Sequence, residues 1–364
     1  MKNTYGNSVA LTLFGESHGE KIGVVIDGLA PGVKVDEEKI SYQLSLRKPQ
    51  GKLSTARVEE DKVNIVSGVF NGYTTGTPIC ILIDNNNTRS KDYSLIRAMA
   101  RPGHADYTAY EKYHGYEDYR GGGHFSGRIT AALVAAGAIF MSALEEKGIM
   151  VGTHIKECMN ISDKAFGNYE EDIKKLNGKM FATLCSDAEE EMKKVILEAS
   201  EKKDSVGAVL ETAIINVPAG VGEPFFDSVE SRLSHALFSI PGIKGVEFGM
   251  GFDMAKHYGS EVNDPFRMEN GKVVTSTNNN AGINGGITNG MPIIVKTVVK
   301  PTPSIYQAQD TVNFMENTDA KMEIAGRHDP AIFPRARVVV DSLCAFVMVD
   351  MLSERFGTDY FGEK

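Results

Sequence analysis

The segment from Arg128 to Lys147 constrains the fold more than any other part of the sequence, because it is apolar and dense in alanine. Ser126 is a good N-cap before it, and Gly148 is a typical C′ residue after it. Small side chains permit a helix to pack closely against its neighbours. We therefore predict a buried central helix, around which the other elements must pack.

The predicted strands follow one another without regular helices between them. Alternation of apolar and polar residues, or a short apolar run, indicates a strand. These patterns occur at 9–14, 22–27, 62–66, 79–83, 208–217 and 293–299. A doubly wound parallel sheet needs a helix between successive strands, so this order favours antiparallel sheets with helices packed on them. The predicted fold class is α+β.

The other predicted helices differ in how much of their surface they should bury. One begins after the N-cap Asp36 and runs to Arg47, which it places at the helix end before Pro49. A charged helix is predicted at 187–203, with Asp187 as its cap, and apolar helices are predicted at 226–239 and 335–356. The long loops at 84–127 and 275–290 are unusual for a compact domain, and the motifs in the first favour a function for it.

Two segments of the chain are weakly similar to each other in sequence. Residues 68–83 and 284–299 both place Gly-x-Pro-Ile after a turn rich in glycine and threonine, and both continue as a strand. A duplicated half with one sheet in each copy explains this similarity, and chance similarity of turn residues explains it equally well.

Composition excludes several classes of function. The net charge of −9 argues against a general nucleic-acid binder, although some loops are locally basic and could focus a small polyanion into one cleft. The four cysteines are far apart, which predicts neither a zinc site nor a disulfide framework and fits a cytoplasmic protein. No run of 18 apolar residues occurs, so we expect no membrane span.

Two histidines lie in glycine-flanked loops. His18 is in GESHG at the end of a predicted strand, and His104 is in RPGHADYT between Arg101 and Asp106. A nearby cation disfavours the protonated imidazole and a nearby carboxylate favours it, a combination typical of tuned acid–base groups. Either histidine alone could be a turn residue bonded to local backbone, but the pair makes acid–base chemistry the stronger interpretation.

Three further motifs suit an anionic ligand. GGGHFSGR (121–128) offers backbone amides and Arg128 at a helix N-terminus, where anions bind well, although it could also be a flexible turn. KPTPS (300–304) offers an ammonium and hydroxyls, or is an ordinary proline turn, and GRHDP (326–330) is either a salt-bridged corner or a source of a base at Asp329. Walker A, GxGxxG, HExxH, GxSxG and kinase motifs are absent, and no metal site is predicted.

The sequence blocks as a whole resemble the chorismate synthase family. The blocks that carry the resemblance occur in the family's order: FGESHG (14–19), SGVFNGYTTGTPI (67–79), RSKDYS (89–94), RPGHADYT (101–108), DYRGGG (118–123), AAGAI (135–139), KGVEFGMGF (244–252), NGGITNG (284–290) and GRHDP (326–330). They cover the chain nearly end to end. The resemblance implies one domain over residues 1–364, a βαβ sandwich with helices between two antiparallel four-stranded sheets, and a homotetramer.

The resemblance also implies the chemistry. The family's carbon–oxygen lyases convert 5-enolpyruvylshikimate 3-phosphate to chorismate and phosphate by 1,4-anti elimination, with reduced FMN and no net redox change. By similarity, His18 protonates the leaving phosphate, His104 lies near the flavin and Asp329 helps to keep the proton-accepting position of the flavin basic. Some members also oxidise NADPH, but no nicotinamide motif favours that activity in this sequence.

Binding residues carry over motif by motif. The substrate-binding set implied by the resemblance is Arg47, Lys52, Arg101 and Arg128. The flavin-binding set is His124, Ser126, Gly285, Lys300, Pro301, Thr302, Pro303, Ser304 and Arg327. The chain departs from the family pattern where lysines at 48 and 52 replace arginines, where Gln50 replaces a glycine, and at His124, Phe125 and Pro303. Lysine keeps the charge of arginine but loses the two-pronged hydrogen bonding.

Two other function classes compete with the lyase. A non-catalytic module that binds anions or nucleotides would use the same glycine loops to hold phosphate. A flavin oxidoreductase that uses NADPH would also need a flavin site. Release of phosphate from the enolpyruvyl substrate with reduced FMN separates the lyase from the binding module, and NADPH oxidation by the isolated chain would support the oxidoreductase.

Overall fold

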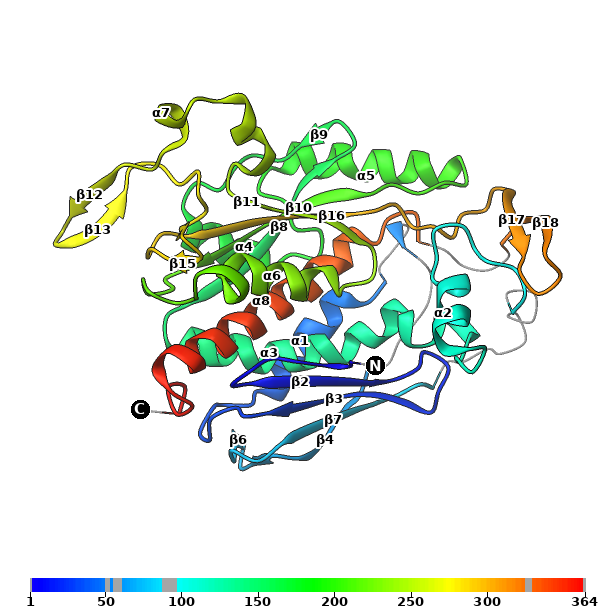
Figure 1. Cartoon of the computed structure of the whole chain (residues 1–364), viewed down its shortest axis with the longest axis horizontal. Coiled ribbons are helices and arrows are strands. Elements are labelled where there is room, and N and C mark those ends of the chain that lie inside the picture. Colours follow the sequence, from blue (N-terminus) through cyan, green and yellow to red (C-terminus); the bar gives the residue numbers. More distant parts are fainter. Residues whose placement is uncertain (1, 50–52, 55–60, 87–96, 325–328, 363–364) are drawn as a thin grey trace.

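The computed structural model of the chain describes residues 2–49, 53–54, 61–86, 97–324 and 329–362. Strands and helices are mixed throughout these residues, and two five-stranded sheets enclose a layer of helices (Figure 1). The predicted mixture of antiparallel sheets and packed helices is confirmed, because every pairing between strands in the described residues is antiparallel.

The first sheet is built from the N-terminal part of the chain. Its strand order is β1-β2-β3-β7-β4. The strands are β1 (Thr4–Tyr5), β2 (Ala10–Gly15), β3 (Lys21–Asp27), β4 (Val63–Ser67) and β7 (Ile79–Asp84). Inward-facing side chains of β3 and β7 are fully buried, and they form the floor of the core.

The second sheet is built from the remainder of the chain. Its strand order is β11-β16-β10-β8-β9. The strands are β8 (Met150–Cys158), β9 (Ile161–Ser162), β10 (Ala208–Ile215), β11 (Ile243–Phe248) and β16 (Ile293–Val299).

The expectation of two four-stranded sheets is wrong, because each sheet has a fifth strand at its edge. These edge strands, β1 and β9, are only two residues long. A strand of two residues is too short to produce a visible alternation of apolar and polar residues, so the sequence pattern does not reveal it.

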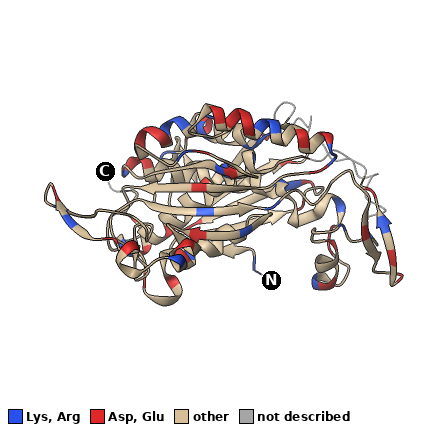
Figure 2. Cartoon of the chain, turned by 90° about the horizontal axis from the view of Figure 1, so that it is seen from above, with Lys and Arg blue, Asp and Glu red and all other residues tan. Residues whose placement is uncertain are grey.

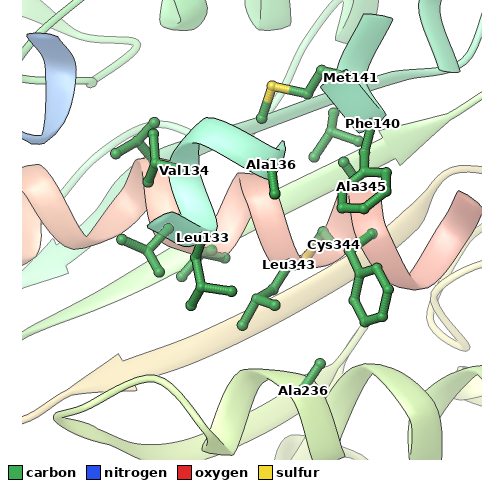
Figure 3. Close-up of a cluster of buried hydrophobic side chains, with 14 of the residues drawn as sticks. Leu133, Val134, Ala136, Phe140, Met141, Ala236, Leu343, Cys344 and Ala345 are labelled. Atoms are coloured by element: carbon green, nitrogen blue, oxygen red, sulfur yellow. The ribbon is translucent and has the colours of Figure 1, made fainter. Parts of the chain in front are cut away.

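Two long helices lie at the centre of the sandwich. Helix α3 (Thr130–Glu146) packs on β3 and β7 of the first sheet, and α8 (Phe333–Phe356) packs on β8 and β10 of the second. The two helices contact each other, and apolar side chains such as Leu133, Phe140 and Leu343 interlock between them (Figure 3). The predicted buried central helix is confirmed as α3. The helical segment Gly127–Glu146, which includes α3, is long and apolar enough to span a membrane, but 83% of its most apolar stretch is buried inside the protein.

The other helices cover or extend this core. Helix α1 (Glu37–Arg47) packs on α3, and α6 (Val229–Phe238) packs on α8. The remaining helices are α2 (Asp106–Tyr113), α4 (Tyr169–Asn177), α5 (Ser186–Glu201) and α7 (Gly259–Val262), with short 3-10 helices at Arg120–Phe125, Gly127–Ile129, Phe225–Asp227 and Gly251–Lys256. Asp36 caps α1 as predicted, but α5 begins after Cys185, so Asp187 lies in its first turn rather than at the cap.

Four small hairpins complete the structure. They pair β5 (Val69–Phe70) with β6 (Tyr73–Thr74), β12 (Phe266–Glu269) with β13 (Lys272–Thr275), β14 (Ile283–Asn284) with β15 (Ile287–Thr288), and β17 (Gln309–Asn313) with β18 (Thr318–Met322). The β12–β13 hairpin projects away from the body of the molecule (Figure 1).

The two halves of the chain share one topology. The first half places its strands in the order β2-β3-β7-β4, and the second places the equivalent strands in the order β8-β10-β16-β11, so the fourth strand lies between the second and third in both. In each half a helix follows the second strand and a long helix follows the fourth. The two similar segments each form a small hairpin and then the fourth strand. Duplication explains all these features together, whereas chance similarity of turns does not.

A row of charges crosses the second sheet on the face turned away from α8. His154, Glu211, Lys296 and Glu247 are cross-strand neighbours on β8, β10, β16 and β11. Figure 2 looks onto this face, where red and blue bands alternate across neighbouring strands. Opposite charges on adjacent strands stabilise a sheet and specify its register.

His154 is the buried end of this row. Its Nε2 lies 3.0 Å from Glu211 and its Nδ1 lies 2.7 Å from Asp163. Because an ionised carboxylate only accepts hydrogen bonds, both ring nitrogens must carry protons and the imidazole is charged. Burial alone would lower the pKa of His154, but the two carboxylates outweigh it and raise the pKa above its ordinary value.

His154→Gln should lower the free energy of unfolding by about 3–5 kcal/mol near pH 6, because it removes the cation from two buried carboxylates. Because the pKa of His154 is higher in the folded protein than in the unfolded chain, the charged imidazole contributes its full stabilisation below the unfolded-chain pKa of about 6.5. The stabilisation is lost as the pH rises through the folded-state pKa. Denaturant unfolding at a series of pH values should therefore show that the loss of unfolding free energy caused by His154→Gln becomes smaller above about pH 6.5.

His257→Gln is the matched control, since His257 also lies between two carboxylates, Asp253 at 3.7 Å and Glu261 at 3.6 Å, but is exposed. Its replacement should change stability little. If the stability lost in His154→Gln increased with rising pH, that result would contradict a charged imidazole at His154.

Candidate active site

His18 lies in the loop between β2 and β3 and is 8% exposed. Its Nδ1 is 2.9 Å from the hydroxyl oxygen of Ser17, and that hydroxyl lies 3.2 Å from the carbonyl oxygens of Arg120 and Gly121. The hydroxyl has one proton, and the carbonyls can only accept it. Nδ1 of His18 and the Ser17 hydroxyl share a hydrogen bond whose donor depends on the tautomer of the ring.

The glycine loop Gly121–Gly123 separates His18 from His104. All three glycines have positive φ, at 59°, 85° and 53°. A Cβ on Gly121 would overlap the ring of His18, and a Cβ on Gly122 would lie 3.1 Å from Cε1 of His104. A Cβ on Gly123 would overlap the carbonyl oxygen of Asp118, so positive φ and close neighbours together require glycine at all three positions.

His104 lies just before α2 and contacts two charged neighbours. Its Nδ1 is 2.9 Å from Asp106 Oδ1 and 3.0 Å from Arg101 Nη2. Arg101 also donates three hydrogen bonds to Asp106, from its backbone N, Nε and Nη2. Burial alone would raise the pKa of Asp106, but its bonds with Arg101 and His104 hold the pKa well below its usual range. Arg101 was expected to bind substrate, and these contacts show that much of its guanidinium is already engaged.

Arg47 and Arg128 come together around Asp61. Arg47 ends α1 and is 3% exposed, and its Nη2 lies 3.4 Å from Asp61. Nη1 of Arg128, just before α3, donates to the other oxygen of Asp61. Burial alone would raise the pKa of Asp61, but the two arginines outweigh it and lower the pKa. These two arginines therefore share one carboxylate at the N-terminal end of α3, where the helix dipole also favours anions.

Asn85 connects the two arginines to the His18 loop. Its amide nitrogen donates to the carbonyl oxygens of Glu16 and Gly19, each at 3.0 Å, and its Oδ1 accepts from Arg128 Nε at 3.0 Å. Sequence reasoning missed Asn85 and Asp61 because each is remote in sequence from its partners. Ser17 could have been found, since it directly precedes His18 in the GESHG motif.

The segment Lys300–Ser304 lies against the loop that carries His104. Nζ of Lys300 donates to the carbonyl oxygen of Gly103, and a Cβ on Gly103 would lie 3.2 Å from Pro303. Burial, with a smaller effect of Lys244, lowers the pKa of Lys300. Nδ1 of His124 lies 2.8 Å from the carbonyl oxygen of Gly15, and His124 and His104 line the same pocket.

The other predicted residues are less closely grouped. Asp329 is 6% exposed and forms an ion pair with Arg335 at the start of α8. Gly285 lies in the β14–β15 hairpin before β16, whereas Lys300 follows β16. The strand between them in the chain, β16, has seven residues, and an extended strand of that length spans about 20 Å. Lys52 and Arg327 lie outside the described residues.

A pocket of about 300 Å³ opens beside His104. Aromatic side chains form much of its wall, and its other lining residues include acidic groups. The aromatic residues are Phe14, Tyr113, Tyr116, Tyr119, Phe125 and Phe314. The three tyrosines belong to a series at 107, 110, 113, 116 and 119, a regular spacing that could have drawn attention to this wall.

Gly121→Ala should displace the ring of His18, because the added Cβ overlaps it. The matched control is Gly148→Ala, which has a similar φ of 73° but no atom within 4 Å of its Cβ. Both variants should lose about 1 kcal/mol of stability from the left-handed backbone. Only Gly121→Ala should change the ¹⁵N resonances of His18, and unchanged resonances in that variant would contradict the packing described.

Comparisons with known proteins agree with this arrangement. The family model described as chorismate synthase matches residues 9–353. The chain is 48% identical to chorismate synthase of Pyrococcus abyssi, over 95% of this chain and 96% of that protein, and 45% identical to chorismate synthase of Thermococcus gammatolerans, over 96% and 97%. A solved structure titled "Crystal Structure of Chorismate Synthase" superposes with a TM-score of 0.76 at 30% identity, over 97% of this chain and 94% of that one.

These relatives match the chain over nearly its whole length, and they favour the lyase over a module that only binds anions. The loops that hold His18, His104 and Arg128 all lie within the matched range. The chain therefore belongs to the chorismate synthase family, the carbon–oxygen lyases that release phosphate from 5-enolpyruvylshikimate 3-phosphate to form chorismate in the shikimate pathway.

Proposed function

We propose that the elimination takes place at the N-terminal end of α3, with His18 and His104 on opposite sides of the glycine loop Gly121–Gly123. The observation that carries this proposal is the bridge through Asn85, which joins the His18 loop to Arg128. The bridge puts an acid and an anion-binding surface in one compartment. That combination is what release of a phosphate from a polyanionic substrate requires.

Arg47 and Arg128 bind the anionic groups of the substrate. The substrate has two carboxylates and a phosphate, and a guanidinium can pair with either through two parallel hydrogen bonds. Asp61 holds both guanidinium groups in place and offsets part of their mutual repulsion. Arg101 and Lys52 belong to the proposed substrate shell by resemblance, with Arg101 already engaged by Asp106.

His18 acts as the general acid. Ser17 engages its Nδ1, and Nε2 of the protonated ring delivers the proton to a phosphate oxygen as the carbon–oxygen bond breaks. The small exposure of the ring limits access by water, which strengthens the electrostatic effect of the neighbouring arginines. A proton transfer of this kind contributes about 10²–10⁴-fold to a rate.

The residues Lys300–Ser304 fit a phosphate-bearing cofactor. Lys300 is partly desolvated, and the hydroxyl of Thr302 is buried without a hydrogen-bond partner in the part of the chain that the structure describes. We assign reduced FMN to this side of the glycine loop, held by His124, Ser126, Gly285, Lys300–Ser304 and Arg327. When bound, reduced FMN supplies electron density for cleavage of the carbon–oxygen bond and accepts the proton from carbon. His104 and Asp329 orient it.

His18→Ala and His104→Ala should each lower kcat by about 10²–10⁴-fold and leave substrate affinity nearly unchanged, because acid–base groups act mainly in the transition state. Phosphate release and chorismate absorbance, followed anaerobically with chemically reduced FMN, give kcat, and calorimetry gives affinity. A parallel assay with NADPH and oxidised FMN tests whether the chain reduces its own flavin.

His257→Ala provides the control, because His257 is an exposed histidine outside the site. Near-normal turnover by both His18→Ala and His104→Ala would refute the assigned roles, whatever the control does.

A homotetramer completes the proposal. Phe225, Phe226 and Phe252 are 85%, 92% and 84% exposed, and large exposed aromatic groups of this kind are typical of subunit interfaces. The strand β16 also lies between Gly285 and Lys300 in the chain, and we place Gly285 in the flavin site of a neighbouring subunit. A cytoplasmic location is supported by four unpaired cysteines, Cys80, Cys158, Cys185 and Cys344. A single domain over residues 1–364 is supported by the large continuous cluster of buried apolar side chains.

Phe225→Ser combined with Phe226→Ser should shift the protein from tetramers to smaller species, because it removes apolar surface from the proposed interface. Light scattering during size-exclusion chromatography measures the mass, with 39.6 kDa for each subunit. A wild-type protein that remained at the monomer mass at all concentrations would exclude the tetramer.

A further inference from the structure

The carboxylate of Asp106 contacts His104 at Nδ1, with Oδ1 2.9 Å away, whereas the glycine loop lies nearest Cε1 and Nε2. We propose that Asp106 is a positioning residue for the reaction: it holds a proton on Nδ1 of His104 and so directs Nε2 of the ring toward the bound ligands. This inference rests on the proposed role of His104 and adds the residue that orients it.

Asp106 is suited to this task because it is buried and ionised. Its side chain is 8% exposed, and its pKa lies well below its usual range because the bonds from Arg101 and His104 outweigh the effect of burial. Oδ2 accepts from the backbone N of Arg101 at 2.9 Å and from Nε at 2.8 Å, and Oδ1 accepts from Nη2 at 2.6 Å. These bonds from Arg101 fix the carboxylate, so Oδ1 presents a stationary acceptor to Nδ1.

Nδ1 of His104 has a second neighbour, Nη2 of Arg101 at 3.0 Å, which can only donate. The two contacts demand opposite tautomers. An unprotonated Nδ1 would put its lone pair against the negative Oδ1, whereas a protonated Nδ1 makes a charge-assisted hydrogen bond, which is about twice as strong as a neutral one. Nη2 already donates to Oδ1, so it does not depend on Nδ1 for a partner. The balance therefore favours the proton on Nδ1.

The glycine loop fixes the other side of the ring. A Cβ on Gly122 would lie 3.1 Å from Cε1 and 3.3 Å from Nε2, so the imidazole is held closely between the backbone of Gly122 and the carboxylate of Asp106. The side chain of His104 is 19% exposed and lines the aromatic pocket described above. Once Asp106 engages Nδ1, Nε2 is the nitrogen left for a ligand.

A purely structural role for Asp106 as the cap of α2 does not explain its contacts. The N-cap of α2 is Ala105, and no side chain caps this helix end. The Asp106 carboxylate bonds to Arg101 and His104 rather than to the first amides of the helix.

Asp106→Asn tests the inference while keeping the shape of the side chain. The amide oxygen would accept the bonds from N and Nε of Arg101, and the NH₂ group would then face Nδ1 and drive the ring proton to Nε2. We expect kcat to fall by about 10²–10⁴-fold with KM changed by less than about threefold. Asp253→Asn is the matched control, because Asp253 lies 3.7 Å from Nε2 of His257 on the surface outside the site, and it should leave kcat unchanged.

A double-mutant cycle separates positioning from general structural damage. If Asp106 acts through His104, adding Asp106→Asn to His104→Ala should lower kcat by less than about twofold further. Losses that multiply in the double variant would overturn the inference. Unchanged kcat in His104→Ala would instead overturn the proposed function, and a normal kcat in Asp106→Asn with a slow His104→Ala would overturn only the role of Asp106.

A second variant and a direct observation cover the case in which Asp106→Asn does not fold. Asp106→Glu keeps the carboxylate, so its kcat should lie above that of His104→Ala, and an equal loss would count against the inference. In the FMN-bound wild-type protein with ¹⁵N-labelled histidine, the resonances absent from His104→Ala identify His104. A protonated Nδ1 is the expected state, and an unprotonated Nδ1 would overturn the inference.

Discussion

The close contact between α3 and α8 at Gly137 is the constraint on which the rest of the structure depends. A Cβ on Gly137 would overlap Ser342 of α8, so the two helices approach more closely than larger residues would permit. Each helix also covers one sheet, and the main cluster of buried apolar side chains runs from one sheet through both helices to the other. A change in the distance between α3 and α8 would therefore move the two sheets relative to each other.

This contact also assembles the site, because both central helices begin at the same end of the sandwich (Figure 1). The segment before α3 contributes the glycine loop and Arg128, and the segment before α8 contributes Asp329. The positive ends of two helix dipoles thus lie at the same end of the sandwich as Arg47, which is buried, and Arg128, which is half-buried. A chain of net charge −9 thereby presents a local basic surface to a polyanionic substrate.

Much of the fold could be predicted because local signals agreed with the final packing. The N-cap Asp36, the apolar segment of α3 and the alternation in β3, β7, β10 and β16 all indicate the elements that form. Edge strands of two residues carry no such signal, and the four strands per sheet implied by the resemblance did not include them.

In the site too, residues within one motif could be predicted from the sequence, whereas contacts between distant segments could not. His18, His104 and Arg128 lie in motifs whose residues act together locally, and the structure gathers their loops around Gly121–Gly123. Asp61 and Asn85 could not be predicted, because their partners are distant in sequence. Arg101 sits in a recognisable motif, yet only the folded chain reveals that Asp106 engages it.

The central claim is that the glycine loop divides the site into a phosphate side at His18 and a flavin side at His104. A crystal structure with FMN and the enolpyruvyl substrate bound tests it most directly. The account predicts Nε2 of His18 within about 3 Å of a phosphate oxygen, with Arg47 and Arg128 on the substrate's anions and His104 facing the flavin across the loop. A phosphate bound away from His18, or both histidines on the same side of the loop, would contradict the account.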